Sequence, residues 1–274
     1  PLIKENDPDQ IAATVRRIID RRVEIRPEIA GALFSTQMHG FLLADHSGAK
    51  LTNYISWQDE RCTETSADGR DYLDRVRALL SAEDVKRSGV AVKPSLAMCN
   101  LYRLFFDFTL PGSARFCTLG DYQIARLAGE QPVCHLTNAA SSGLADLETG
   151  NWSLPVIHKL GFKDIIFPDI LPENQCCGTY RTRGREIRLY PAVADHQAAM
   201  YGAYLTPDTD LAVNIGTGSQ ICVISDARLY GDYELRPFFD GTYLKTICHI
   251  PAGRALNVLV DFVRDIGSRR AAWK

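Results

Sequence analysis

The chain has 274 residues and a mass of 30.5 kDa, with 31 Lys and Arg residues against 33 Asp and Glu. The resulting net charge of −2 argues against nucleic-acid binding, which is typical of chains with a basic excess. Hydrophobic residues make up 46% of the chain and charged residues 23%, which is ordinary globular usage. No apolar run reaches the roughly 18 residues that span a bilayer, so we expect no membrane partner.

The eight cysteines are scattered through the chain and form no CxxC pair. This pattern predicts reduced, mostly buried thiols, a cytoplasmic location and no cysteine metal site. The chain does not begin with Met, and its first residues lack the basic and apolar regions of a signal peptide. We therefore expect a trimmed or partial chain.

Apolar periodicity and turn residues predict the elements of the first part. In chain order they are a helix over 8–22, a buried strand over 29–35, strand-like pieces at 40–44 and 51–57, a helix over 70–85, a helix over 120–128 and a short helix closed by Gly161.

The pattern changes after residue 188. We expect a helix over 195–205, a hairpin over 211–224 and a second hairpin over 234–248 that turns at Asp240-Gly241. A last helix, ended by Gly267, is expected to turn its apolar residues inward: Leu256, Leu259, Val260, Val263 and Ile266. The whole pattern predicts an α/β fold with a boundary near 206–210.

The tip of the first hairpin reads Gly216-Thr217-Gly218-Ser219. Two glycines let backbone N–H groups approach a ligand closely, and successive N–H groups in such a turn form an anion-binding concavity. A nucleotide phosphate would fit there. The tetrapeptide taken alone is more typical of a plain glycine-rich turn.

Asp195 stands at the start of a helix of small residues, some twenty positions before this turn. The helix dipole and backbone N–H groups keep such a carboxylate ionised, so it could accept a proton from a hydroxyl group. A plain helix cap is the simpler interpretation of Asp195 alone. A base and a phosphate clamp together are, however, the two parts that a kinase needs.

Two further segments offer groups for a polyhydroxylated ligand. Gln37 and His39 follow a predicted strand, a common position for ligand-binding groups in α/β proteins. Trp57 offers a flat apolar wall, and Asp59 and Arg61 can fix polar geometry. Structural roles for the same residues are the alternative.

In order and spacing these motifs resemble the FGGY carbohydrate kinases over nearly the whole chain. The residues that carry the resemblance are Gln37-Met38-His39-Gly40, Trp57-x-Asp59-x-Arg61, Asp195 before its small-residue helix, and Asn214-Ile215-Gly216-Thr217-Gly218-Ser219. Weaker similarities are Leu119-Gly120-Asp121-Tyr122 and Thr137-Asn138-Ala139-Ala140-Ser141. Within the family, Glu234-Leu235-Arg236-Pro237-Phe238-Phe239 and the form of the turn look most like sedoheptulokinases.

The resemblance implies an actin-like, ribonuclease-H-like ATPase fold, with two domains around a cleft. Residues 1–207 would form a sugar-binding domain and residues 208–274 the start of an ATP-binding domain. Asp195 would be the general base, and Met38 and His39 would lie at the sugar. Residues 57–61 would line or support its pocket. Residues 216–219 would approach the phosphates of ATP, with Mg²⁺ as the metal ion.

The chain departs from the family pattern at both ends. Family members begin with a strand, an Asp-x-Gly-Thr-type phosphate loop and two more strands before the helix expected here at 8–22, and their second domain continues beyond Lys274. We therefore expect a truncated chain with little or no kinase activity by itself. Missing strands would expose a sheet edge, through which a homodimer could form.

The resemblance leaves two alternatives to a sedoheptulose kinase. The acceptor could be another polyol of the family, such as D-xylulose, L-ribulose or glycerol. The chain could also be a non-catalytic sugar-binding fragment, because the phosphate loop is absent.

Overall fold

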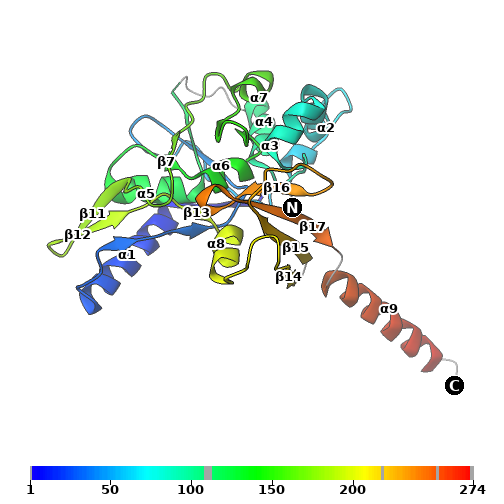
Figure 1. Ribbon diagram of the computed structural model, residues 1–274. Coiled ribbons are helices and arrows are strands. Elements are labelled where there is room, and N and C mark those ends of the chain that lie inside the picture. Colours follow the sequence, from blue (N-terminus) through cyan, green and yellow to red (C-terminus); the bar gives the residue numbers. More distant parts are fainter. Residues whose placement is uncertain (1, 108–112, 217–218, 251–252, 272–274) are drawn as a thin grey trace. The chain divides into compact units, whose positions relative to one another are not determined.

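A computed structural model describes residues 2–107, 113–216, 219–250 and 253–271 (Figure 1). The chain divides into two compact units, Pro1–Gly202 and Ala203–Lys274. The sugar-binding and ATP-binding assignments of domains 1–207 and 208–274 stay predictions.

The first unit mixes helices with short strands. Its helices are α1 (Pro8–Ile25), η1 (Arg61–Thr63), α2 (Tyr72–Leu79), α3 (Ala82–Ser88), α4 (Ala97–Asp107), α5 (Leu119–Ala128), α6 (Leu136–Ser141), α7 (Leu154–Lys159) and α8 (Asp195–Gly202). Its strands are β1 (Glu5–Asn6), β2 (Gly31–Ala32), β3 (Ser35–Thr36), β4 (Leu42–Ala44), β5 (Tyr54–Ile55), β6 (Arg115–Cys117), β7 (Val133–Cys134), β8 (Ala145–Asp146), β9 (Asn151–Trp152), β10 (Asp169–Ile170), β11 (Gly178–Thr182), β12 (Arg185–Leu189) and β13 (Val193–Ala194).

Helix α1 begins at Pro8, as predicted. The Asp7 carboxylate accepts a hydrogen bond from the backbone N–H of Asp9, and Pro8 occupies the first turn, where no donor is needed. The apolar face of α1 packs with α5 and the sheet β11-β12-β2, in a core built around Val23, Ile187 and Leu189 (Figure 1). This packing holds α1 against α5 and the sheet.

The predicted buried strand over 29–35 is wrong in its extent. Residues 31–32 pair with β12, whereas residues 35–36 pair with β13, so the chain changes partner between β2 and β3. Leu33 at the break is 78% exposed. An apolar run alone cannot show that its two halves belong to different ladders.

The predicted helix over 70–85 is two helices, α2 and α3. Leu80 between them is extended, and Ser81 caps α3 through a reciprocal bond pair with Asp84. Such a capping box starts a new helix because it satisfies two N–H groups that would otherwise lack partners. The predicted helices over 8–22 and 120–128 are confirmed as α1 and α5.

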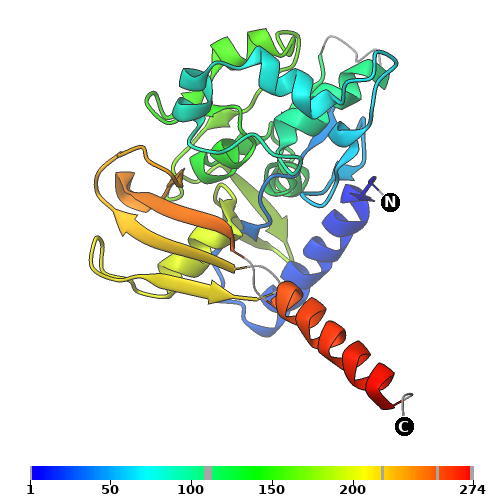
Figure 2. The same ribbon diagram turned by 90° about the vertical axis from the view of Figure 1, so that its right-hand side faces the viewer.

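The second unit is a four-stranded antiparallel sheet of order β14-β15-β17-β16 (Figure 2). Its elements are β14 (Ala212–Ile215), β15 (Ser219–Ser225), β16 (Glu234–Pro237), η2 (Phe239–Gly241), β17 (Tyr243–Ile250) and α9 (Gly253–Ala271). Both predicted hairpins are confirmed. Asp240 and Gly241 take the positive φ angles of 54° and 76° that the second turn requires.

Helix α9 differs from the prediction. It continues past Gly267 to Ala271, and the apolar residues expected to face inward are exposed, with Leu256 at 59% and Val263 at 59%. Both views show α9 running away from the sheet of its own unit (Figures 1 and 2). The periodicity identified an apolar face, but the described part of the chain provides no surface that covers it.

The structure has no disulfide bond among the described cysteines, and five of them are buried, as predicted: Cys62, Cys99, Cys117, Cys134 and Cys222. Among the described residues, no helix combines the length and the apolar composition that crossing a membrane requires.

Candidate functional site

Two parallel strands of the first unit end side by side. In the β3–β13 pair, Val193 lies opposite Ser35 and Ala194 opposite Thr36. The next residues along the two strands are Asp195 and Gln37. The carboxyl ends of adjacent parallel strands are a frequent binding place in α/β proteins, so this pairing brings two predicted site residues to one edge.

Asp195 is the first residue of α8 and is exposed. Its Oδ1 accepts a hydrogen bond of 2.8 Å from the backbone N–H of His196. That bond and the positive end of the helix dipole both favour the ionised carboxylate. The predicted place of Asp195 at a helix start is confirmed, and its role as a base stays a prediction.

Residues 37–40, hereafter the acceptor loop, connect β3 to the residues before β4. Gln37 is half-buried, Met38 is buried and His39 takes a left-handed backbone with φ of 69°. The His39 N–H donates to Ser141 Oγ at 3.1 Å, and His39 Nδ1 lies 2.6 Å from the Ser141 carbonyl oxygen. Because a carbonyl only accepts, Nδ1 carries the proton, and the imidazole is fixed in place.

Helix α6 bonds to the chain on both sides of Val193 in β13. Asn138 Nδ2 donates to the Ala192 carbonyl at 2.8 Å, and the Ala194 N–H donates to Thr137 Oγ1 at 3.1 Å. Together with Ser141, these residues tie the acceptor loop and the chain before Asp195 to one helix. The segment 137–141 is one of the weaker sequence similarities, and the structure gives it a positioning role.

Trp57 leaves β5 near the acceptor loop. Phe41 and Ile55 exchange two backbone hydrogen bonds of 3.0 and 2.7 Å in an antiparallel bridge. His39 precedes Phe41 by two residues and Trp57 follows Ile55 by two, so both lie beyond the same end of that bridge. Trp57 is 46% exposed, which leaves a flat apolar face for a sugar ring.

Asp59 and Arg61 form a buried ion pair. Asp59 is 0% exposed, and its two carboxylate oxygens accept from Arg61 Nε and NH2, both at 2.8 Å. The same carboxylate accepts from the Lys4 N–H at 2.7 Å, and Arg61 reaches Glu5 at 2.6 Å. Burial opposes the charge of Arg61, but these bonds outweigh it and raise its pKa.

The ion pair therefore holds the N-terminal segment against the turn that carries Trp57. This fits a role in supporting the pocket, one of the two roles that the resemblance implies for residues 57–61. Direct contact of Asp59 or Arg61 with a sugar stays a prediction.

Tyr54 is a residue of this region that the sequence pattern did not reveal. It is 0% exposed, and within the described part of the chain its hydroxyl has no hydrogen-bond partner. A Cβ atom placed on Gly40 would lie 2.1 Å from that oxygen, so the phenol presses against the acceptor loop. Burial, with a smaller contribution from the charge of Asp195, raises the pKa of Tyr54.

The predicted phosphate turn belongs to the second unit. Thr217 and Gly218 lie outside the described residues. The Gly216 carbonyl accepts a 3.1 Å hydrogen bond from the Gly253 N–H, and Ser219 is buried at the start of β15. The Ser219 hydroxyl lacks a hydrogen-bond partner in the described chain, so it is a donor suited to a phosphate oxygen.

A metal site is not evident in the described ranges, where no group of three or more His, Cys, Asp or Glu side chains has the geometry to hold an ion. A Mg²⁺ ion that arrives with a nucleotide needs few protein ligands, because it keeps several waters and binds phosphate oxygens.

No family model matches the chain. Curated relatives at low identity are carbohydrate kinases. A xylulose kinase of Staphylococcus xylosus is 23% identical in an alignment of 218 positions that covers 76% of this chain and 43% of the relative. A sedoheptulokinase of Mus musculus is 24% identical in an alignment of 310 positions, gaps included, that covers 97% of this chain and 60% of the relative. The chain thus spans about half the length of the curated relatives it matches.

Solved structures of sugar kinases have the same fold. The crystal structure of xylulose kinase from Rhodospirillum rubrum has a TM-score of 0.82 at 22% identity and covers 97% of this chain and 56% of that chain. The crystal structure of Plasmodium falciparum glycerol kinase with ADP has a TM-score of 0.81 at 18% identity and covers 95% of this chain and 56% of that one.

These comparisons confirm the predicted fold class, and the relatives are FGGY-type carbohydrate kinases. The chain has the α/β, actin-like fold of these enzymes.

Proposed function

We propose that this chain carries the acceptor site of a kinase that phosphorylates a sugar hydroxyl with ATP. The observation that carries the proposal is the β3–β13 register, which puts Asp195 beside the acceptor loop. The names of the relatives support the reaction class, since they include xylulose, sedoheptulose and glycerol kinases.

In the proposed reaction, Asp195 accepts the proton of the attacking hydroxyl. The hydroxyl oxygen forms a bond to the γ-phosphorus of ATP, the bond to the β–γ bridging oxygen breaks, and ADP leaves. Gln37, His39 and Trp57 orient the sugar, while Gly216 and Ser219 are assigned to the nucleotide phosphates. Mg²⁺ would neutralise charge on the phosphates.

The acceptor that we propose is a ketose, with sedoheptulose as the first candidate. The mouse and human sedoheptulokinases among the relatives support it, and so does the sequence of residues 234–239. Xylulose and glycerol kinases among the relatives keep D-xylulose, L-ribulose and glycerol as competing acceptors. A panel of these polyols in one binding assay ranks them.

Calorimetric titration of the chain with sedoheptulose, followed by a non-hydrolysable ATP analogue, tests the proposal. We expect saturable ketose binding that His39→Ala weakens at least tenfold, with the exposed His46→Ala as the matched control. If no polyol of the panel binds, the acceptor-site assignment is wrong. Binding of sugar without any nucleotide binding would favour the alternative, a non-catalytic sugar-binding fragment.

A coupled ADP-release assay distinguishes the catalytic role of Asp195 from sugar binding. Asp195→Asn keeps the shape of the side chain and removes the base, so turnover is expected to fall about 10²- to 10⁴-fold while ketose binding changes only a few-fold. The same assay measures the predicted low activity of this chain by itself. Measurable turnover of the wild type that Asp195→Asn leaves unchanged would contradict the role of Asp195.

A further inference from the structure

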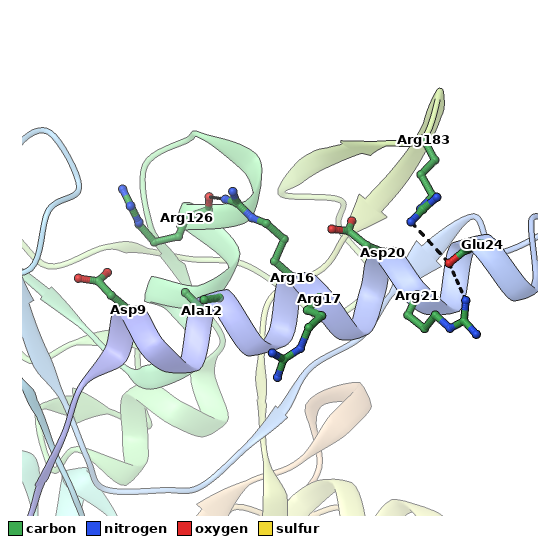
Figure 3. Close-up of a pocket in the computed structure, with 10 residues that line it drawn as sticks. Asp9, Ala12, Arg16, Arg17, Asp20, Arg21, Glu24, Arg126 and Arg183 are labelled. Atoms are coloured by element: carbon green, nitrogen blue, oxygen red, sulfur yellow. Dashed lines mark hydrogen bonds and ion pairs between the residues drawn. The ribbon is translucent and has the colours of Figure 1, made fainter.

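A hollow of about 530 Å³ lies beside α1, and it shares no residue with the acceptor site (Figure 3). Its lining comes from α1, from the end of α5 and from the turn between β11 and β12. Five arginines line it: Arg16, Arg17, Arg21, Arg126 and Arg183. Three carboxylates line it as well: Asp9, Asp20 and Glu24.

Glu24 forms ion pairs with two of the five arginines. Its Oε2 lies 2.8 Å from Arg21 NH1 and 3.5 Å from Arg183 NH2, as the dashed lines in Figure 3 show. Hydrogen bonding to Arg21 and the charge of Arg183 lower the pKa of Glu24. This end of the hollow is therefore balanced by its own ion pairs.

The other two carboxylates are satisfied mainly by hydroxyl groups. Tyr122 donates to Asp9 at 2.6 Å. Tyr180 and Thr182 donate to Asp20 at 2.8 and 2.7 Å. Both bonds to Asp20 end on Oδ1, and Asp9 Oδ2 lies 3.7 Å from Lys50 Nζ, so in the described chain neither carboxylate forms an ion pair with an arginine of the hollow.

The other three arginines of the hollow are Arg16, Arg17 and Arg126. Within the described residues, these three side chains form no ion pair. Arg16 is nevertheless held in place, because it donates to the Arg126 carbonyl at 3.3 Å (Figure 3). It also lies over the Tyr180 ring, at 6.0 Å from the ring centroid. A fixed guanidinium loses less freedom on binding, and an anion would relieve the repulsion between neighbouring cations.

We propose that this arginine hollow binds the phosphate group of a small phosphorylated metabolite. A guanidinium presents planar paired donors that match a phosphate dianion in bidentate geometry. The hollow lies within the roughly 300–1,000 Å³ typical of small-molecule sites, so it has room for the organic part of the ligand. The inference does not depend on the proposed kinase reaction.

Calorimetric titration of the full chain at low salt with inorganic phosphate, and separately with glycerol 3-phosphate, tests this site. Wild type is expected to bind at least one probe, and the double variant Arg16→Gln/Arg126→Gln to weaken that binding at least tenfold. Arg16→Lys/Arg126→Lys keeps the charges but loses the paired donors, so an intermediate loss is expected. Arg77→Gln, on the exposed surface of α2, is the matched control.

Amide chemical-shift mapping with the same probes follows the wild-type chain and needs no variant to fold. Shifts should gather at residues 16, 17 and 126. Tighter binding of glycerol 3-phosphate than of phosphate would support an organic phosphate as the ligand class, and equal or weaker binding would contradict it in favour of free phosphate. Absence of binding, unchanged binding by the Gln double variant, or loss of binding in Ser219→Ala instead would overturn the proposal.

Discussion

Asp121 is a fully buried carboxyl group at the start of α5. Its Oδ2 accepts from the Thr118 N–H at 2.9 Å as part of a capping box. Burial disfavours the ionised form and outweighs these bonds, which raises the pKa of Asp121 to about 6. The capping box fixes the helix start, whereas burial of the ionised carboxylate destabilises the fold at neutral pH.

The pH dependence of stability follows from the sign of that shift. A carboxyl group whose folded pKa lies above its unfolded value stabilises the fold at low pH and loses this contribution as pH rises through about 6. We expect the unfolding free energy to lose on the order of 3 kcal/mol from this group between pH 4 and pH 7. In urea titrations Asp121→Asn should flatten that trend, with Asp71→Asn, at the cap of α2, as control. Parallel pH profiles for wild type and Asp121→Asn would contradict the argument.

Tyr54 carries a buried hydroxyl group that should not contribute to stability. Burying a hydroxyl without a partner costs about 1–3 kcal/mol, so Tyr54→Phe should leave thermal stability unchanged or raise it. Phe keeps the ring that packs against Gly40. Thermal unfolding followed by circular dichroism measures the effect, with Tyr122→Phe as the control that loses a real hydrogen bond to Asp9. A lower melting temperature for Tyr54→Phe would show that its hydroxyl has a stabilising partner.

At the scale of elements, α6 links a histidine to the chain before Asp195. His135 caps α6: its Nδ1 accepts from the Thr137 N–H at 3.3 Å, and Thr137 Oγ1 lies 2.8 Å from the same nitrogen. Burial lowers the pKa of His135, although Glu173 at 3.1 Å opposes the shift. The cap requires the neutral ring, because Nδ1 must accept a hydrogen bond, and the lowered pKa favours that form.

His135 should make the fold less stable in mild acid. Because its folded pKa lies below the ordinary 6.5, the unfolded chain takes up the proton first, and the contribution of His135 is lost as pH falls below 6.5. His135→Asn offers an acceptor oxygen near the position of Nδ1 and should show a weaker loss of unfolding free energy between pH 6.5 and 5. His158→Asn, on the exposed surface of α7, is the control. The opposite sign of the Asp121 effect separates the two groups.

Sequence reasoning succeeded where the signals are local. Apolar periodicity identified α1, and Asp240-Gly241 identified the turn of the second hairpin. It failed where tertiary partners decide, as at the break between β2 and β3 near Leu33. The β11–β12 hairpin was also missed, because its charged residues give no clear alternation.

The candidate site divides in the same way. Asp195 and His39 carry chemical groups that a sequence pattern can identify. Tyr54 could not be identified, because its isolated hydroxyl results from the approach of Gly40, which only the folded chain brings about.

At the scale of the whole molecule, α9 exposes an apolar face to solvent. Leu259 and Val263 are 56% and 59% exposed, along with neighbouring apolar residues. A contiguous apolar surface on a helix favours association. We expect concentration-dependent self-association in sedimentation velocity, and a shift toward the monomer in Leu259→Lys/Val263→Lys. Asn257→Lys adds charge to the same helix without removing an apolar side chain and should change little. A monomeric wild type at high concentration would contradict this expectation.

The proposed acceptor site lies at the ends of β3 and β13. Backbone amide shifts of the isotope-labelled chain, recorded during titration with sedoheptulose and the competing polyols, test it most directly. For at least one polyol, the largest shifts are predicted at residues 37–40 and 195–197, with a smaller response at Trp57. Saturable shifts that gather elsewhere in the first unit, or no shifts with any polyol, would contradict it.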